Sequence, residues 1–360
     1  DSIWKGESAM KNLRDLLENL EYQCIQGTLD KEITAVIYDS RNAQKDGLFV
    51  CIKGAVSDGH SYAAEVAQKG VSVLVVQDLV QVPEDVTVIQ VEDTRYALAC
   101  ISAAWFDHPA EKLKTIGITG TKGKTTTTYL IKSILENAGH KTGLIGTIET
   151  IIGEEKIPSA NTTPESYLIQ EYFAKMAEAG CDSVVMEVSS QGLMLHRTSG
   201  FTFDIGIFTN IEPDHIGPNE HKDFDDYLHC KSMLFRQCKV GIFNGDDPHL
   251  ERILEGHTCQ AETFGFSEKA DLRAENTRLV TGKGTLGIAY DVKGLMDFPV
   301  EIDLPGKFSV YNSLTAIAVC RHFGVTVENI QKALKNAHVK GRIEMVKVSD
   351  DFTLMIDYAH

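Results

Sequence analysis

Apolar runs and helical patterns alternate along the first third of the chain. The runs are short and β-branched, and between them apolar residues recur every three or four positions. This alternation predicts a small α/β domain over residues 1–111. The predicted strands are Thr34–Tyr38, Leu48–Ile52, Val71–Val76 and Val86–Val91, and the predicted helices are Ser8–Leu20, His60–Gln68 and Thr94–Phe106.

A second alternating unit is predicted over residues 112–340. It follows Asp107–Lys112, a linker candidate because Pro109 discourages helix at the residue before it. Its apolar strands indicate a mostly parallel sheet, and short alternating strands after Gln260 predict an antiparallel extension. The predicted strands are Lys114–Thr119, Leu144–Thr147, Ser183–Val188, Ile205–Thr209, Val240–Phe243, Leu286–Val292 and Pro299–Leu304; the predicted helices are Lys124–Ala138, Glu165–Glu178, Phe224–Phe235, Pro248–Leu254, Ser309–Phe323 and Val327–Ala337.

The last residues have the pattern of a third domain that has only begun. Residues 339–344 are typical of a linker, and Phe352–Ile356 is predicted to be a strand. A strand without a covering helix does not complete an α/β domain. We therefore expect residues 341–360 to be the start of an incomplete third domain.

The amino-acid composition and net charge indicate which kinds of binding partner the protein disfavours. The chain has 360 residues, 43% hydrophobic and 24% charged, with a formal net charge of −16. This is the composition of a globular protein, and the excess negative charge disfavours nucleic acid and anionic membranes as partners. No apolar run is long enough to span a membrane, and the eight cysteines form no C-x-x-C pair. We expect a cytoplasmic protein with reduced cysteines and no membrane span.

A glycine-rich segment between an apolar strand and a helix carries the strongest chemical signal. Its G-T-K-G-K-T-T core has the residue types of a phosphate loop, although Ile118 stands where the strict pattern has its first glycine. Glycine lets backbone N–H groups face a phosphate, and the lysine and the following threonine suit the phosphates and Mg²⁺. An ordinary strand-to-helix turn is the alternative on these residues alone. The predicted nucleotide-binding residues are Gly120, Thr121, Lys122, Gly123, Lys124, Thr125 and Thr126.

With that loop, the sequence resembles the Mur ligase family, whose variant of the loop accounts for Ile118. Further segments, Tyr38-Asp-Ser-Arg41 and Gly54–His60, are similar to the MurE members of the family. The resemblance covers essentially the whole chain. It implies a UDP-sugar domain, a central ATPase domain and a Rossmann-like third domain. It also implies an ATP-dependent ligase that adds the third amino acid of the peptidoglycan stem peptide to UDP-MurNAc-L-Ala-D-Glu.

The resemblance assigns substrate contacts to several segments of the chain. From the residues alone, Tyr38–Arg41 is also explained as an Asx-capped turn and Asn161–Pro164 as a helix start. Arg197 would hold a carboxylate or phosphate of the substrate, for which a guanidinium fork is suited. The substrate-binding residues implied are Tyr38, Ser40, Ala55, Val56, Ser57, Asn161, Thr162, Thr163, Ser189 and Arg197.

The resemblance also implies a site for two Mg²⁺ ions. Thr125, Glu187 and His215 would be ligands, and Lys231 would be carbamylated by CO₂ to give a further carboxylate. From the residues alone, His215 is also explained as structural and Lys231 as a solvated helix residue. Lys124, Lys231, His215 and Glu187 are the implied catalytic residues. Asn244, Asn312 and Arg342 would complete the ATP site.

The expected small molecules are UDP-MurNAc-dipeptide, ATP and a diamino acid, bound by a monomer. The family adds meso-diaminopimelate or L-lysine, and its selecting residues lie in the third domain. Residues 213–221 resemble lysine-adding members. Alternatives are another Mur-type ligase, a folylpolyglutamate- or cyanophycin-type ligase, a P-loop kinase, or a nonenzymatic nucleotide-gated module.

Overall fold

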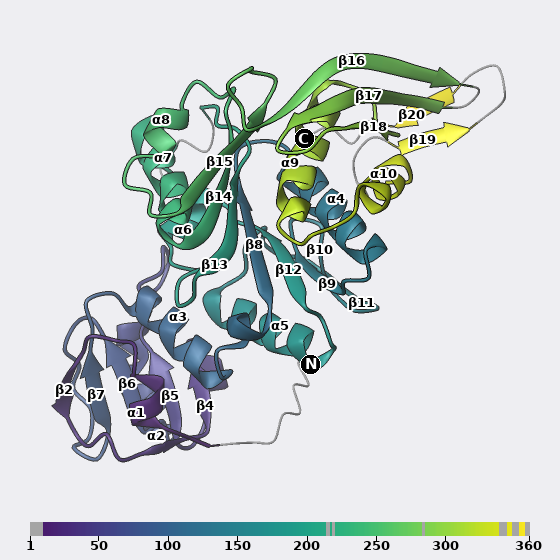
Figure 1. The fold of residues 1–360 in the computed structure, drawn as a ribbon. Coiled ribbons are helices and arrows are strands. Elements are labelled where there is room, and N and C mark those ends of the chain that lie inside the picture. The colour runs from purple at the N-terminus through teal and green to yellow at the C-terminus, as the bar shows by residue number, and fades with distance from the viewer. Residues whose placement is uncertain are drawn as a thin grey trace. The chain divides into compact units, whose positions relative to one another are not determined.

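The computed structural model describes residues 10–213, 217, 220–282, 285–337, 344–347 and 353–356 (Figure 1). The chain divides into two compact units. The first comprises Asp1–Lys112, Pro164–Lys175 and Met194–Phe201, and the second comprises Leu113–Thr163, Met176–Leu193 and Thr202–His360. The first unit therefore takes two short segments from the middle of the chain.

The first unit is built on a five-stranded sheet of order β2-β7-β6-β5-β4. The strands β4 to β7 are parallel, and β2 runs antiparallel to β7. Alternate side chains of β5 enter two different clusters, because successive residues of a strand point to opposite faces. Helices α1 and α3 pack on one face and α2 on the other. The bounds are α1 Leu13–Leu16, β2 Gln23–Gln26, β4 Ala35–Ile37, β5 Gly47–Val50, α2 Ala63–Gln68, β6 Val73–Val76, β7 Thr87–Gln90 and α3 Thr94–Trp105.

Two predicted helices of this unit are shorter than expected. Within residues 10–20 the only helix is α1. Before it, β1 (Lys11–Asn12) pairs with β3 (Glu32–Ile33). The Asn12 side chain then caps the helix by accepting the Arg14 N–H. The prediction Ser8–Leu20 was therefore wrong in extent. The segment from His60 begins as a 3₁₀ turn, Gly59–Tyr62, and becomes α-helical at α2.

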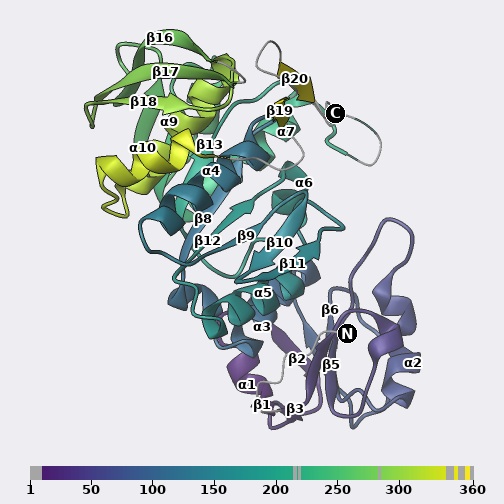
Figure 2. The same cartoon turned by 90° about the vertical axis from the view of Figure 1, so that its right-hand side faces the viewer.

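The second unit contains an eleven-stranded sheet of order β11-β10-β9-β12-β8-β13-β14-β15-β16-β17-β18 (Figure 2). Strands β9 to β16 in this order are parallel, and β17 and β18 continue antiparallel. The predicted parallel sheet with an antiparallel extension is confirmed. The sequence did not indicate the β10–β11 hairpin on the opposite edge. The bounds are β8 Lys114–Thr119, β9 Thr142–Ile145, β10 Glu149–Ile152, β11 Glu155–Pro158, β12 Ser183–Glu187, β13 Phe203–Phe208, β14 Cys238–Asn244, β15 Gln260–Gly265, β16 Leu272–Gly282, β17 Thr285–Gly294 and β18 Phe298–Ile302.

The predicted helices that follow residue 112 begin and end within a few residues of their predicted bounds. Of the helices observed there, α5 (Ser166–Glu178) lies mostly in the first unit, and α6 (Ser190–Met194) was not predicted. The largest difference is α7, which gives way to a 3₁₀ turn, Met233–Arg236, before the predicted end. A small hairpin of β19 (Glu344–Lys347) and β20 (Thr353–Ile356) follows. The helices are α4 Lys124–Asn137, α5 Ser166–Glu178, α6 Ser190–Met194, α7 Phe224–Ser232, α8 Leu250–Ile253, α9 Lys307–Arg321 and α10 Val327–Lys335.

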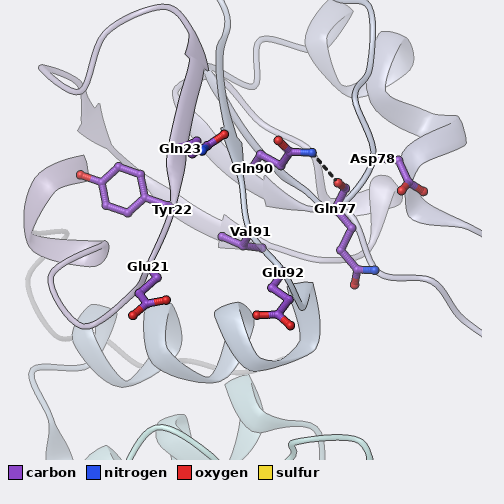
Figure 3. A pocket seen from close by; sticks show the side chains of 8 residues that line it. All are labelled: Glu21, Tyr22, Gln23, Gln77, Asp78, Gln90, Val91 and Glu92. Carbon is purple, nitrogen blue, oxygen red and sulfur yellow. Dashed lines mark hydrogen bonds between the residues drawn. The ribbon is translucent and has the colours of Figure 1, made fainter.

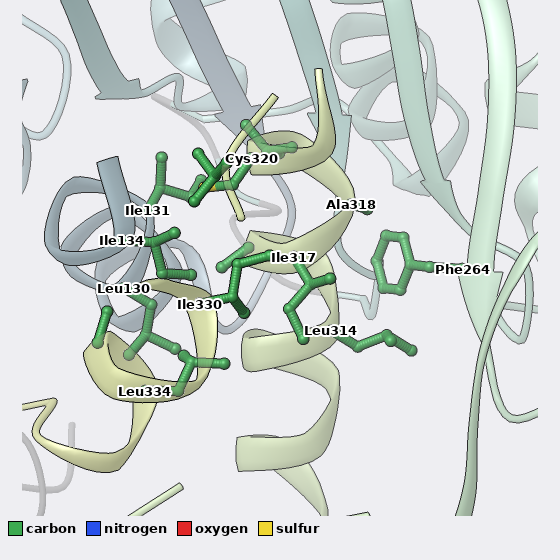
Figure 4. Close-up of a cluster of buried hydrophobic side chains, with 14 of the residues drawn as sticks. Leu130, Ile131, Ile134, Phe264, Leu314, Ile317, Ala318, Cys320, Ile330 and Leu334 are labelled. Carbon is green, nitrogen blue, oxygen red and sulfur yellow. The ribbon is translucent and has the colours of Figure 1, made fainter. Parts of the chain in front are cut away.

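A buried apolar cluster joins α4 to α9 and α10 (Figure 4). Leu130 and Ile134 of α4 share it with Leu314 and Ile317 of α9 and with Leu334 of α10. Burying each such side chain contributes about 1.5–3 kcal/mol relative to exposure. The cluster therefore holds α4, α9 and α10 against one another. Among the described residues, no helix is both long and apolar enough to cross a bilayer.

Candidate functional site

The predicted phosphate loop connects β8 to α4. Gly123 is the N-cap of α4 with φ 90°, and Gly120 has φ 152°. A Cβ at residue 120 would lie 1.8 Å from Oγ1 of Thr209, and a Cβ at residue 123 would lie 2.6 Å from Oδ1 of Asn312. Both positions therefore need glycine for space as well as for backbone conformation. The loop ends at a fourteen-residue helix whose first N–H groups can receive an anion.

Two side chains that directly follow strand β13 form hydrogen bonds with the loop. Asn210 Oδ1 accepts the Lys122 N–H at 2.9 Å, and Asn210 Nδ2 donates to the Lys122 carbonyl at 2.9 Å. Thr209 Oγ1 donates to the same carbonyl at 3.0 Å. The Thr121 hydroxyl lies 3.0 Å from the hydroxyl of Tyr227. These contacts hold the backbone of the loop in its conformation.

Two lysines meet at one backbone oxygen of the loop. Lys124 Nζ donates to the Gly120 carbonyl at 2.6 Å, and Lys231 Nζ donates to it at 3.1 Å. Lys231 is 2% exposed, and its ammonium lies 4.7 Å from the centre of the Tyr227 ring. The interpretation of Lys231 as a solvated helix residue is wrong. The structure places the lysine at the loop, 111 residues away in sequence.

Glu187 brings oxygen atoms of three segments together. It ends β12, is 1% exposed, and its Oε1 accepts from the hydroxyls of Thr125 at 2.9 Å and Thr147 at 3.1 Å. Its Oε2 accepts the Thr147 N–H at 2.6 Å. Carboxylate and hydroxyl oxygens are the ligands that Mg²⁺ prefers, so this donor set fits that ion. His215 and Arg342 lie outside the described residues.

The predicted substrate loop, residues 161–164, is hydrogen-bonded to the end of β12, where Glu187 lies. Thr163 Oγ1 donates to the Glu187 carbonyl at 3.0 Å and accepts the Ser189 N–H at 2.9 Å. The Thr162 hydroxyl lies 3.0 Å from that of Thr147. Asn161 is exposed. Thr162, Thr163 and Ser189 therefore lie within one or two hydrogen bonds of Glu187.

The two asparagines predicted for the ATP site have different surroundings. Asn244 is buried at the end of β14, where Nδ2 donates to the Thr209 carbonyl and Oδ1 accepts the Asp246 N–H. This is the strand-end turn that explains the residue structurally. Asn312 lies against the phosphate loop, where its Oδ1 accepts the Thr127 hydroxyl at 3.4 Å. The structure thus brings Asn312, but not the amide of Asn244, to the loop itself.

In the first unit, residues 54–57 form an exposed turn closed by the Gly54 N–H to the Ser57 carbonyl. Ala55, Val56 and Ser57 are exposed, and Val56 is 100% exposed. A valine with no covering group is available to an apolar part of a ligand. The turn is flanked by the bridge between Lys53 and Asp58.

Tyr38 follows β4, and its ring centre lies 6.0 Å from that of Tyr167. Burial, with the carboxylates of Glu165 and Glu171 adding to it, raises the pKa of Tyr38 to about 12. Ser40 begins the 3₁₀ turn Ser40–Asn42, which Asp39 caps by accepting the Arg41 N–H, so the Asx-capped turn is present.

Arg197 is largely buried and forms an ion pair with Glu165 at 3.3 Å. An arriving substrate carboxylate would therefore meet a guanidinium that already faces an anion of the protein.

The first unit also contains an open pocket of about 570 Å³ (Figure 3). Three of its side chains are carboxylates and three are glutamine amides, with Gln90 Nε2 donating to the Gln77 carbonyl at 2.9 Å. None of the residues predicted from the sequence lines it. Its carboxylates oppose an anionic diphosphate. It is lined by Glu21, Tyr22, Gln23, Gln77, Asp78, Gln90, Val91 and Glu92.

Comparison with known proteins identifies the family of this chain. Residues 118–320 match the Mur ligase middle domain, and residues 32–106 match the Mur ligase family catalytic domain. A Clostridium acetobutylicum protein named UDP-N-acetylmuramoyl-L-alanyl-D-glutamate–2,6-diaminopimelate ligase 1 is 43% identical over 352 residues, which cover 97% of this chain and 72% of that protein. The chain belongs to the Mur ligase family. A Clostridium perfringens ligase of the same activity name is 39% identical over 355 residues, with the same two shares.

Solved structures agree with the family fold. A structure of a UDP-N-acetylmuramoyl-L-alanyl-D-glutamate–2,6-diaminopimelate ligase superposes with a TM-score of 0.83 at 21% identity, covering 98% of this chain and 72% of the other. MurF from Acinetobacter baumannii gives a TM-score of 0.63 at 22% identity, covering 98% and 73%. Mycobacterium tuberculosis folylpolyglutamate synthase gives a TM-score of 0.56 at 16% sequence identity, and the match covers 74% of this chain and 67% of the other. These values establish a shared fold across ligases with different substrates.

Sequence reasoning missed three residues of the Mur ligase loop region. Asn210 braces Lys122, Thr147 donates twice to Glu187, and Tyr227 contacts both Thr121 and Lys231. Two of them stand inside segments that carry the family resemblance, T-N-I-E-P-D-H and Y-L-H-C-K. In both segments a neighbouring residue, His215 or Lys231, was predicted to be functional. The only indication for Asn210 and Tyr227 was that they lie in the same segments.

Proposed function

We propose that this Mur ligase joins an amino acid to UDP-MurNAc-L-Ala-D-Glu at the expense of ATP, in the cytoplasm and as a monomer. The observation that carries the proposal is the convergence of Lys124, Lys231 and Glu187 on one phosphate loop. The names of the curated relatives support the substrate, and a Thermotoga maritima MurF structure was solved with ADP. The relatives also favour meso-diaminopimelate as the added amino acid, over the lysine that residues 213–221 suggested; that stretch lies partly outside the described residues.

In the proposed reaction the D-glutamate γ-carboxylate of the substrate attacks the γ-phosphorus of ATP. ADP leaves, and an acyl phosphate forms. The amine of the amino acid then attacks the acyl carbon, phosphate leaves, and the amine loses a proton. Both reacting partners of the first step are anions, so positioning and positive charge are what the protein must supply.

The loop residues suit these tasks. The N–H groups of residues 120–126 and the α4 N-terminus would receive the β- and γ-phosphates of ATP. Lys124 would exchange its contact with the Gly120 carbonyl for a phosphate oxygen. Asn312 would contribute at the nucleotide side, with Asn244 keeping the β14 turn in place. Arg342 is proposed to reach ATP as well.

Mg²⁺ fits the oxygens of Thr125 and Glu187, with His215 and a carbamylated Lys231 as further proposed ligands. Bound there, the ions would neutralise charge on the transferring phosphoryl group. The Lys231 ammonium is buried beside the Lys124 ammonium, and this supports carbamylation of Lys231. Carbamylation would remove one of the two positive charges that lie at one carbonyl oxygen.

Substrate contacts are proposed for residues of both units. Thr162, Thr163 and Ser189, with Asn161, would hold the muramoyl-dipeptide close to Glu187. Tyr38, Ser40 and the exposed turn Ala55–Ser57 would hold the UDP end. Arg197 would take the D-glutamyl carboxylate or a phosphate in place of Glu165.

Trapping the acyl phosphate tests this function. The protein is incubated with ATP, Mg²⁺ and UDP-MurNAc-L-Ala-D-Glu, with hydroxylamine in place of the amino acid. We expect a hydroxamate of the substrate with wild type and none with Lys124→Ala. With meso-diaminopimelate or L-lysine added instead, mass spectrometry identifies the tripeptide product. ADP release with a phosphorylated hydroxyl and no hydroxamate would instead indicate a kinase, and full function in Lys124→Ala would exclude both enzymes.

A further inference from the structure

His221 is held at both ring nitrogens in the second unit. It is 1% exposed, its Nδ1 lies 3.1 Å from Oδ2 of Asp226, and its Nε2 lies 2.7 Å from Oγ of Ser190. In a neutral ring Nδ1–H donates to the carboxylate, and the Ser190 hydroxyl donates to Nε2. One imidazole thus connects the start of α6, directly after β12, to the first turn of α7.

Both ends of this bridge lead to the phosphate loop region. Ser190 follows Ser189, whose N–H donates to Thr163, and Thr163 in turn donates to the Glu187 carbonyl. On the other side, the centre of the His221 ring lies 5.1 Å from that of Tyr227.

Tyr227 carries the connection further. Its hydroxyl contacts Thr121 of the loop, and its ring lies beneath the Lys231 ammonium. One path of contacts from Glu187 to Lys231 therefore runs through His221, beside the path through the loop residues Gly120 and Thr125.

The three side chains have the order of a Ser–His–Asp hydrolase triad, but the surroundings differ. Ser190 is 4% exposed and begins a helix, whereas a nucleophilic serine must present its oxygen to a substrate. The buried hydroxyl is better explained as an anchor. Removing the imidazole would take this partner from the buried Ser190 hydroxyl, whereas Asp226 is partly exposed and its Oδ2 also accepts the Lys222 N–H at 3.3 Å.

We propose that His221 is a positioning residue that couples the Glu187 strand end to α7 and so fixes Lys231 over the phosphate loop. The kinetic part of this inference rests on the proposed ligase function. The physical reason is geometric: Asp226, Tyr227 and Lys231 share α7, so a shift of its first turn moves the lysine with it. A displacement of about 1 Å in a catalytic group can cost about 100-fold in rate.

Three substitutions separate the two contacts. In His221→Gln the amide can reach the place of Nε2 and keep Ser190, whereas in His221→Asn it can replace Nδ1 and keep Asp226. His221→Ala removes both. We expect kcat to fall about 100-fold in the alanine variant and less in the two amide variants, with KM for ATP little changed. His257→Gln is the control, because His257 is exposed and its Nδ1 lies 2.7 Å from the Leu254 carbonyl of its own turn.

Hydrogen exchange of the substrate-free protein tests the coupling without relying on activity. Amides of α7 should exchange faster in His221→Ala than in wild type, while those of α9 keep their protection. Unchanged α7 exchange and an unchanged kcat would overturn the inference, as would a loss of kcat that only follows the unfolded fraction. If wild type itself formed no hydroxamate, the ligase proposal would fail, while the exchange experiment would still decide the coupling. If the alanine variant does not fold, the glutamine and asparagine variants give the same comparison.

Discussion

Lys124 and Lys231 donate to the same acceptor, the carbonyl oxygen of Gly120. Two ammonium groups on one oxygen repel each other, and the repulsion is stronger away from bulk water. Lys231 is the more buried of the two and also lies over the Tyr227 ring. The pair is therefore an arrangement in which losing one positive charge is favourable, and an arriving phosphate or a carbamate on Lys231 would each relieve it.

Carbamylation of Lys231 should be visible in mass and in CO₂ dependence. We expect the protein in bicarbonate buffer to carry the added mass of one CO₂ on the peptide containing Lys231, and ligase activity to fall when CO₂ is removed. Lys231→Ala should lower kcat by about 100-fold or more, as removal of a charge-stabilising group does. Lys269→Ala, at an exposed lysine, is the control. Full activity in CO₂-free buffer would contradict the carbamate.

Gly123→Ala should abolish nucleotide binding because its Cβ would collide with Asn312. Gly139 is the control glycine, which separates this collision from backbone strain. Gly123 and Gly139 have φ of 90° and 93°, but a Cβ at 123 would meet Asn312 at 2.6 Å, whereas one at 139 meets nothing within 4 Å. Gly139→Ala therefore measures the backbone strain alone, about 1–2 kcal/mol. We expect Gly139→Ala to lower the free energy of unfolding by that amount with ATP affinity intact. Equal ATP affinities in the two variants would refute the steric argument.

Glu187→Gln should raise the Mg²⁺ concentration needed for hydroxamate formation. The amide keeps the shape but loses the charge that attracts the cation, and its NH₂ group cannot accept a hydrogen bond. We expect a rate loss of about 100-fold at low Mg²⁺, partly recovered as Mg²⁺ increases. Glu149→Gln is matched for burial, because Glu149 is 5% exposed and accepts from the Tyr129 hydroxyl. An identical Mg²⁺ requirement in both variants would argue against Glu187 as a ligand.

Alkaline stability should depend on Cys51. Burial, assisted by the Asp58 carboxylate, raises the pKa of the Cys51 thiol to about 12, against about 8.5 in an unfolded chain. Below about pH 8.5 both states keep the proton and the contribution is complete; above it the unfolded state loses the proton first, so stability falls as pH rises toward 12. Urea unfolding should show that the stability advantage of wild type over Cys51→Ala shrinks through this range. Cys24→Ala, at an exposed cysteine, should show no such trend.

Much of the second unit could be predicted because its signals are local. The strand β8 is buried at all positions after Lys114, and α4 begins at Lys124, directly after Gly123. The helix predicted over Ser8–Leu20 failed because pairing of β1 with β3 competed with helix propensity, and that partner is distant in sequence. The β10–β11 hairpin was missed because its turn, Gly153-Glu154, lies between short strands with little alternation.

The sequence by itself predicted the phosphate loop, most of the strands and helices of the second unit, and the family. These depend on residue types at fixed short spacings, where backbone conformation follows directly from glycine, proline and apolar periodicity. Only the tertiary structure decided which distant residues meet: Lys231 and Lys124 at one carbonyl, Asn312 against Gly123, and His221 between Ser190 and Asp226. The reason is that parallel strands bring their carboxyl ends to one edge, so residues a hundred positions apart become neighbours only when the sheet has formed.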